Sequence, residues 1–152
     1  MATTATITIT SSDMSDNTIS ISNTMTLTKA GGVVDIPYTT GLKRRNFAAT
    51  TIKDLVNLFK NDDLITASKA AKVYVKNVGT ATDKHVKIGI GNIATGDSLD
   101  AEEIGRLYGG DWMMFPYDAT LTGGSNHANN ADIYIIPSTA DSVDIEWCVF
   151  YE

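Results

Sequence analysis

The sequence predicts a mainly β, antiparallel domain, on two observations. Apolar residues alternate with polar residues over most of the 152-residue chain, and this period of two indicates strands with one buried and one solvated face. The alternating runs consist chiefly of Thr, Ser, Val, Ile and Tyr, which suit a pleated, half-buried surface. Hydrophobic residues make up 43% of the chain and charged residues 20%, so we expect a folded domain with its own core.

The N-terminal segment, residues 1–30, is rich in Thr and Ser and contains no aromatic residue. Its apolar side chains are small or linear and bury little area alone, so we expect this arm to pair with another strand. That partner is either the rest of the same domain, with the arm as an edge strand, or the sheet of a neighbouring subunit. We expect residues 31–152 to form the antiparallel β domain, for which the resemblance described below implies a β-sandwich. The alternating apolar positions of the arm are Ala5, Ile7, Ile9, Ile19, Ile21, Met25 and Leu27.

One segment breaks the period of two. In "TTIKDLVNLFKNDD", residues 50–63, apolar residues recur at the i, i+3, i+4 and i+7 spacing of a helix. Thr51 and Asp54 resemble a capping box. We therefore predict one short helix covering one end of a sheet, with a strand as the open alternative because tertiary pairing can override so short a pattern.

Four further runs predict the central and C-terminal strands. "KVYVKN" at 72–77 and "HVKIGI" at 85–90 alternate on either side of the polar sequence "VGTATD", which predicts a hairpin over residues 71–91. "DIYII" at 132–136 and "VDIEWCVFYE" at 143–152 supply two more strands.

The stretch "RLYGGDWMMFPYDATLTGG", residues 106–124, is the most aromatic in the chain. Alternation places Trp112 and Met114 on one face of a strand, and Met113 and Phe115 on the other. Since both faces are apolar, both must be covered. Either the strand is internal to a sandwich or its outer face meets another subunit, where aromatic residues and Met are enriched.

The sequence contains no complete motif for nucleotide binding, hydrolysis or calcium binding. Gly89, Gly91 and Ala94 loosely match a dinucleotide-binding fingerprint, but Gly89 lies within a strand alternation, which indicates a strand ending in a turn. Ser125 and His127 stand in a polar loop without a nucleophile elbow. The acidic residues of "GDSLDAEE" at 96–103 match no ordered calcium loop and suit the solvated start of a helix.

We therefore predict that the protein is not an enzyme and needs no cofactor or metal ion. The net charge of -6 argues against nucleic acid as a partner. No apolar run approaches the roughly 20 residues of a membrane-spanning helix, so no membrane partner is expected. The single cysteine, Cys148, excludes an intrachain disulfide and indicates packing.

Several of these stretches together resemble small virion proteins of tailed bacteriophages, especially of marine and cyanobacterial phages. The resemblance is carried by "VYVKNVG", "IGRLYGGDWMMFPY", "ADIYI" and "VDIEWCVFYE". It covers the last half of the chain, whereas the first half is similar only in its general composition and alternation. It implies a β-sandwich or jelly-roll-like fold and a role in decorating or cementing capsids, or in building tails and fibres.

The resemblance and the absence of a catalytic grouping lead to one expected function. The chain is expected to be a non-enzymatic virion protein, made in the host cytoplasm, and most specifically a capsid decoration or cement subunit. Its expected partners are its own copies, as a trimer by analogy, and the major capsid protein or other virion proteins. The alternative is a tail or fibre sandwich that binds carbohydrate or a receptor. Exposure of Trp112 and Tyr117 beside Asn126, Asn129 and Asn130 would favour sugar binding. The candidate assembly residues are Ile7, Ile9, Ile19, Ile21, Trp112, Met113, Phe115 and Tyr117.

Overall fold

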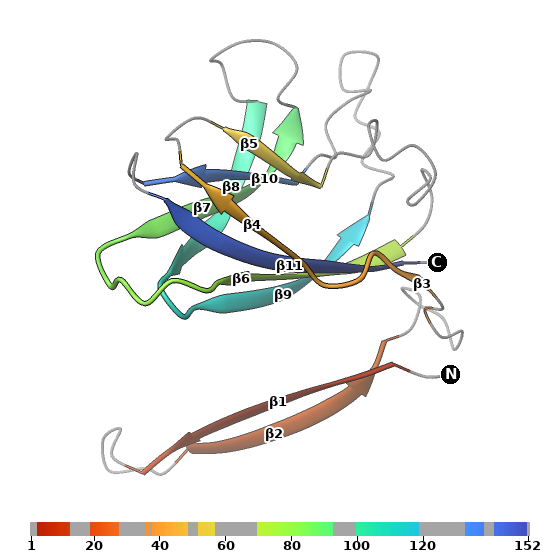
Figure 1. Ribbon diagram of the computed structural model, residues 1–152. Helices are drawn as coiled ribbons and strands as arrows, with labels where there is room; N and C mark the ends of the chain where they lie inside the picture. Colours follow the sequence, from red (N-terminus) through yellow and green to blue (C-terminus); the bar gives the residue numbers. More distant parts are fainter. Residues whose placement is uncertain are drawn as a thin grey trace.

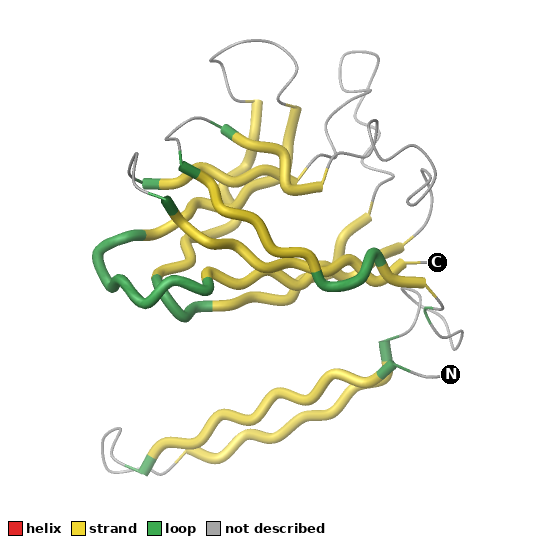
Figure 2. Tube along the Cα trace, viewed as in Figure 1, coloured by secondary structure: helices red, strands yellow, loops and turns green. Residues whose placement is uncertain are grey.

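The computed structural model describes residues 3–12, 19–27, 36, 38–48, 52–56, 70–92, 100–118, 133–138 and 142–151. Every regular element in these ranges is a strand, so none of them holds a helix of the length and apolarity needed to cross a membrane (Figures 1 and 2). The predicted mainly β, antiparallel class is confirmed. The strands are β1 (Thr4–Ser11), β2 (Ile19–Thr26), β3 (Tyr38–Thr39), β4 (Lys43–Phe47), β5 (Lys53–Val56), β6 (Ala70–Asn77), β7 (His85–Asn92), β8 (Asp100–Tyr108), β9 (Trp112–Asp118), β10 (Ile133–Pro137) and β11 (Val143–Tyr151).

The strands that follow β2 form two antiparallel sheets that pack face to face (Figure 1). One sheet has the order β5-β10-β7-β8. In the other, β11 pairs with β6 and β6 with β9, while β3 and β4 both pair along the remaining side of β11. Among the described strands from β4 to β11, consecutive strands stay in one sheet only at β7 and β8. The order β4-β11-β6-β9 facing β5-β10-β7-β8 is that of an eight-stranded jelly roll.

This order corrects the predicted hairpin over residues 71–91. Both of its strands exist, as β6 and β7, but they belong to different sheets. The chain between them, residues 78–84, crosses from one layer to the other instead of making a tight turn. The alternation of apolar residues is the same in both arrangements, because it fixes which face of a strand is buried and not which strand lies beside it.

The core lies between the two inner faces and follows the predicted alternation. Val73 and Val75 of β6 face Val86 and Ile88 of the opposite sheet, and all four side chains are fully buried. Burial of each such side chain contributes about 1.5–3 kcal/mol to folding. The same cluster contains Phe47, Leu55, Leu107, Tyr117, Ile133, Ile135, Val143, Ile145, Val149 and Tyr151.

The helix predicted within residues 50–63 is wrong where the structure describes the segment. Lys53–Val56 is the strand β5, which pairs with the edge of β10. Leu55 is buried in the core, so one member of the helical pattern serves the strand as well. Residues 57–63 lie outside the described residues. The predicted helix start in the acidic stretch is also wrong from Asp100 onward, since Asp100–Tyr108 is the strand β8.

A buried asparagine joins the two connections that cross between the sheets at one end of the sandwich. Asn77, at the end of β6, is only 1% exposed. Its Nδ2 donates to the carbonyl of Leu107 at 3.1 Å, and its Oδ1 accepts from the amide of Gly79 at 3.0 Å. Its backbone amide donates to the carbonyl of Asp111, and its carbonyl accepts from the amide of Gly110. One residue therefore ties the end of β6 to the turn between β8 and β9.

We expect Asn77→Ala to lower the free energy of unfolding by about 2–4 kcal/mol, because the change leaves the Gly79 amide and the Leu107 carbonyl without these partners. The control is Asn46→Ala. Asn46 also donates one side-chain hydrogen bond, to Asp144 at 2.8 Å, but at an exposed position, so its loss should cost less than about 1 kcal/mol. Urea unfolding measures both values. Equal losses for the two variants would contradict this role of Asn77.

Gly109 allows the β8–β9 turn to pack closely against the β6–β7 connection at the same end of the sandwich. A Cβ at Gly109 would lie 2.5 Å from the carbonyl oxygen of Ala81 in the β6–β7 connection, whereas a Cβ at Gly105 would have no atom within 4 Å. Gly109→Ala should therefore destabilise the fold by about 1–3 kcal/mol. Gly105→Ala should be neutral or stabilise the strand by up to about 1 kcal/mol. Thermal unfolding of the two variants checks this difference, and a Gly109→Ala variant as stable as the parent would refute the close packing.

Candidate assembly surface on the N-terminal hairpin

The two alternating runs of residues 1–30 pair with each other. β1 and β2 form a two-stranded antiparallel sheet of their own, in register from Thr4 opposite Thr26 to Ser11 opposite Ile19. The arm thus pairs within itself, which the sequence analysis did not expect, and its pairing with a neighbouring subunit stays a prediction. Leu27, whose amide donates to the carbonyl of Thr3 at 2.8 Å, is buried at the base of the hairpin, together with Ile36.

The hairpin has two chemically distinct faces. Because side chains alternate along each strand, every residue on one face is Thr or Ser. Cross-strand pairs on this face include Thr6 with Thr24, whose Oγ1 atoms are 2.8 Å apart, and Thr8 with Ser22. Neither strand carries a charged residue. The opposite face consists of Ala5, Ile7, Ile9, Ser11, Ile19, Ile21, Asn23 and Met25.

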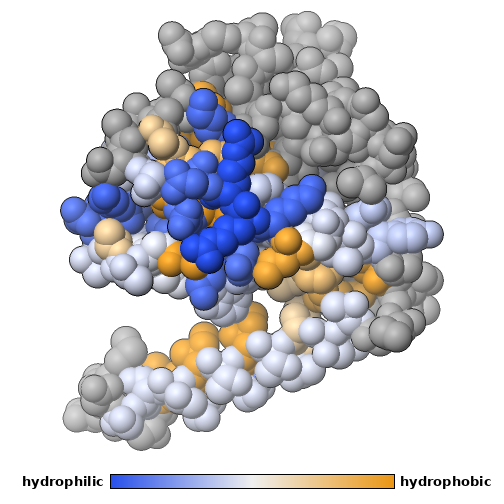
Figure 3. Space-filling view, viewed as in Figure 1, coloured by the Kyte–Doolittle hydropathy of each residue, from blue (hydrophilic) through white to orange (hydrophobic). Residues whose placement is uncertain are grey.

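This second face, called the isoleucine face below, is largely exposed. Ile9 and Ile21 lie directly opposite each other and are each 52% exposed. Ile7 and Ile19 are also exposed, as is Met25. Figure 3 shows apolar side chains along the side of the hairpin that faces the sandwich, with a gap between the two over part of the hairpin. Exposed apolar side chains grouped on one face make a candidate interaction site, and the structure brings together the four isoleucines predicted for assembly.

The edges of the hairpin are open to further pairing. The bond between Leu27 and Thr3 fixes the ladder, and by alternation the backbone amides of Thr4, Thr6, Thr8 and Thr10 point away from β2. The amides of Ser20 and Ser22 point outward from β2 in the same way. Within β1 and β2 there is no proline, charge or bulge that would block another strand.

The edges of the sandwich are protected by contrast. Pro116 interrupts the outer strand β9, where it removes a backbone donor. β8 is irregular opposite Ile88 and Gly89, and it carries Glu103, which pairs with Lys87 and Arg106. The Arg106 hydrogen bond, followed by that of Lys87, lowers the pKa of the Glu103 carboxyl. These groups keep the β8 edge charged.

The remaining side of the sandwich is also unsuited to pairing. β4 presents the basic run of Lys43, Arg44 and Arg45. The chain between β3 and β4 departs from strand geometry at Gly41, whose φ is +72°. β5 is only four residues long. Charges, breaks and short strands are the devices that prevent edge-to-edge association.

The structure divides the aromatic strand between core and surface. Tyr117 is buried in the core, and Met113 and Phe115 pack against that core. Packing within the chain therefore accounts for these three side chains, and their role in assembly stays a prediction. Trp112 stays exposed at 48%, on the outer face of β9 near the ring of Tyr74. The predicted division of faces is correct, but the inner face meets the other sheet of the same chain.

Tyr74 lies on this outer sheet face and is partly buried. Its hydroxyl donates to Glu146 at 3.3 Å. Burial, and next the negative charge of Glu146, raise the pKa of the Tyr74 hydroxyl above its ordinary value. Because Tyr117 is buried, Trp112 and Tyr117 do not form an exposed pair of aromatic rings. Asn126, Asn129 and Asn130, which would have accompanied a sugar-binding pair, lie outside the described residues.

Packing explains the positions of the other described residues that the sequence analysis considered for chemistry. Gly89 lies under the ring of Tyr134, which a Cβ at that position would overlap, so packing explains this glycine. Cys148 is buried, with Sγ 3.0 Å from Oγ1 of Thr39. The described ranges contain no group of three His, Cys, Asp or Glu side chains placed to hold a metal ion. Ser125, His127, Asp97 and Ala94 lie outside these ranges.

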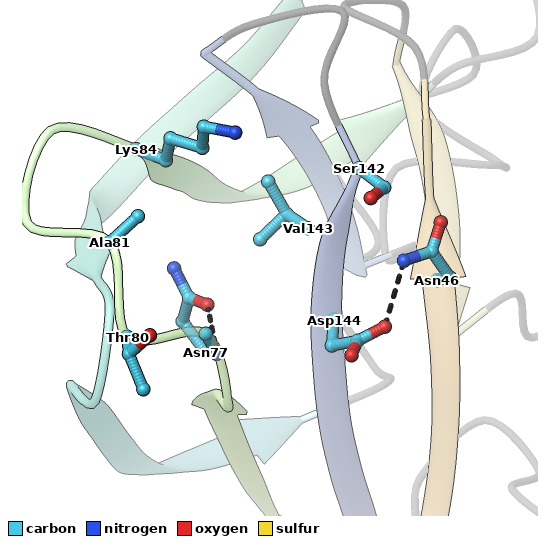
Figure 4. Close-up of a pocket in the computed structure, with 9 residues that line it drawn as sticks. Asn46, Asn77, Thr80, Ala81, Lys84, Ser142, Val143 and Asp144 are labelled. Carbon is cyan, nitrogen blue, oxygen red and sulfur yellow. Dashed lines mark hydrogen bonds between the residues drawn. The ribbon is translucent and has the colours of Figure 1, made fainter.

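A small polar pocket lies at the Asn77 corner (Figure 4). Its volume is about 200 Å³, and Asn46, Asn77, Lys84 and Asp144 contribute to its walls. Asp144 accepts from Asn46 and from Arg44. These two bonds lower the pKa of the Asp144 carboxyl, that of Asn46 having the larger effect.

No family model and no curated protein matches this sequence. Among solved structures, the chain is similar to one from Bacillus endospore appendages, which are described as a novel family of disulfide-linked pili. The TM-score is 0.42 and the sequence identity 17%, over 79% of this chain and 93% of that chain. A likeness at this level supports no conclusion about this chain, whose fold is defined by its own strand order.

Proposed function

We propose that this chain is a repeated, non-enzymatic structural subunit of a viral particle. The observation that carries the proposal is the contrast between its two parts. The sandwich protects its sheet edges, whereas the hairpin exposes two open edges and the uncharged isoleucine face. In a monomeric protein, exposed strand edges and an exposed apolar face would both promote aggregation. Assembly into a larger structure gives both features a use.

The assignment to a tailed-phage capsid, as a decoration or cement subunit, is supported by the sequence resemblance. The residues that carry it, 74–79, 107–117 and 143–152, belong mainly to β6, β9 and β11, which are neighbours in one sheet, and to the turn between β8 and β9. The proposed partners are other copies of the chain and the major capsid protein. The proposed location is the virion, after synthesis in the host cytoplasm.

The basic run on β4 is the proposed contact with the capsid. Arg44 and Arg45 are exposed, and they stand out in a chain of net charge -6. Arg45 also lies over the ring of Phe47, with 5.3 Å between the guanidinium carbon and the ring centroid. This contact fixes the direction of the side chain. A cation held at a sheet edge suits an acidic patch on a partner.

Binding to capsids purified from virions that lack this chain tests the proposal. Wild-type protein should co-sediment with the capsids and saturate at a fixed number of copies, which cryo-electron microscopy would place on the shell. Arg45→Glu should weaken binding at least about tenfold by reversing the charge. Lys72→Glu reverses a charge on β6, which β11 separates from β4, so it should have a smaller effect. Binding at the tail or fibre instead would favour the carbohydrate- or receptor-binding alternative. No binding to any part of the particle would refute the virion role.

A further inference from the structure

The hairpin has three unsatisfied surfaces, namely the isoleucine face and the outer edges of β1 and β2. We infer that all three are satisfied by the hairpins of two other copies, in a closed six-stranded ring with the isoleucine faces inside. This inference deepens the proposed structural role, because it names the self-association surface and the number of copies. It rests on that proposal only for its biological purpose, since the ring can form without a capsid.

The hairpin of another copy is the partner that the chemistry favours. The edges of the sandwich are protected by Pro116, by the charged groups on β8 and by the basic run on β4. A second copy therefore offers no open edge except its own hairpin within the described residues. Neither hairpin strand carries a charge. Two copies of net charge -6 consequently meet there without placing like charges in contact.

The isoleucine face alone is too small for a stable interface, so the edges of the hairpin must also contribute to association. Eight residues per strand give a length of roughly 26 Å, and two strands give a width of roughly 10 Å. The isoleucine face then covers about 260 Å², which is well below the roughly 800 Å² per partner of a stable interface. Packing two isoleucine faces against each other would also leave all four edges open. An arrangement that buries the face and both edges of every copy meets both requirements.

Rotational symmetry supplies that arrangement. Around an axis parallel to the strands, every β1 runs in one direction and every β2 in the other, so β1 of each copy meets β2 of the next in antiparallel pairing. Closure removes all edges. About eight strands enclose an interior just wide enough for side chains. Two copies would give only four strands, so three copies are the smallest ring that approaches this number. Three copies give six strands, and the small residues Ala5 and Ser11 on the isoleucine face ease the packing inside.

Sedimentation equilibrium of the full-length protein tests the inference. The wild type should have about three times the monomer mass of 16.3 kDa. Ile21→Asp places a charge inside the ring and should weaken association at least about a hundredfold. Its matched control is Ser22→Asp, one residue away on the hydroxyl face, which should keep the trimer. Thermal unfolding checks that the sandwich stays folded in both.

A second pair of variants tests the edges alone. Thr8→Pro removes an outward-pointing amide and leaves the isoleucine face unchanged, so it should also dissociate the trimer. Thr8→Val keeps the amide and should not. A wild type that remains monomeric or dimeric up to near-millimolar concentration would overturn the inference, as would a trimer unaffected by both Ile21→Asp and Thr8→Pro. A trimer that binds no capsid would instead refute the proposed virion role and leave the ring intact.

Discussion

An open sheet edge carries backbone amides and carbonyls that another strand can pair with, and this constraint separates the two parts of the chain. The jelly roll protects its edges with Pro116, with ion-paired charges on β8 and with the basic run on β4. The hairpin of β1 and β2 has none of these devices along its described strands. An unprotected edge invites association with other chains, so we propose that association takes place at the open hairpin edges.

The hairpin is also the part least able to stand alone. Ordering each residue of a strand costs about 1–2 kcal/mol of backbone entropy, and a two-stranded sheet in water is marginally stable at best. The side chains of Ile9 and Ile21, each 52% exposed, leave about half of their burial energy unused, which is about 1 kcal/mol per side chain. Association would therefore order the hairpin and bury its face in the same step. The sandwich, held at its corner by Asn77, supplies a fixed base for that step.

Much of the sandwich follows from the sequence because a period of two decides which side chains face inward. Val73 and Val75, and likewise Val86 and Ile88, are buried as the alternation predicts. The same pattern does not specify which strands pair with each other. The sequence therefore predicts a hairpin of β6 and β7, although these strands lie in opposite sheets. The helix prediction failed at β5 because the open side of β10 provides backbone partners, which outweigh four apolar residues at helical spacing.

The proposed assembly surface could be predicted only in part from the sequence. Its four isoleucines stood out because they alternate with Thr and Ser, but nothing in the sequence states that the two runs pair with each other. Met113, Phe115 and Tyr117 were predicted as assembly residues because an apolar strand face must be buried against something. In the structure, this face packs against the core of the same chain. Asn77 was not anticipated, since one asparagine at the end of a strand pattern carries no signal that it will be buried.

Hydrogen exchange of the hairpin amides, measured as protein concentration is raised, tests the central claim most directly. The amides of Ile7 and Ile9 lie inside the ladder, whereas those of Thr6, Thr8 and Thr10 point outward. The account predicts that the outward amides exchange quickly in dilute protein and become protected as copies associate through the hairpin. Outward amides that exchange at the same fast rate at every concentration, in a protein that still assembles, would contradict it and place the assembly surface elsewhere.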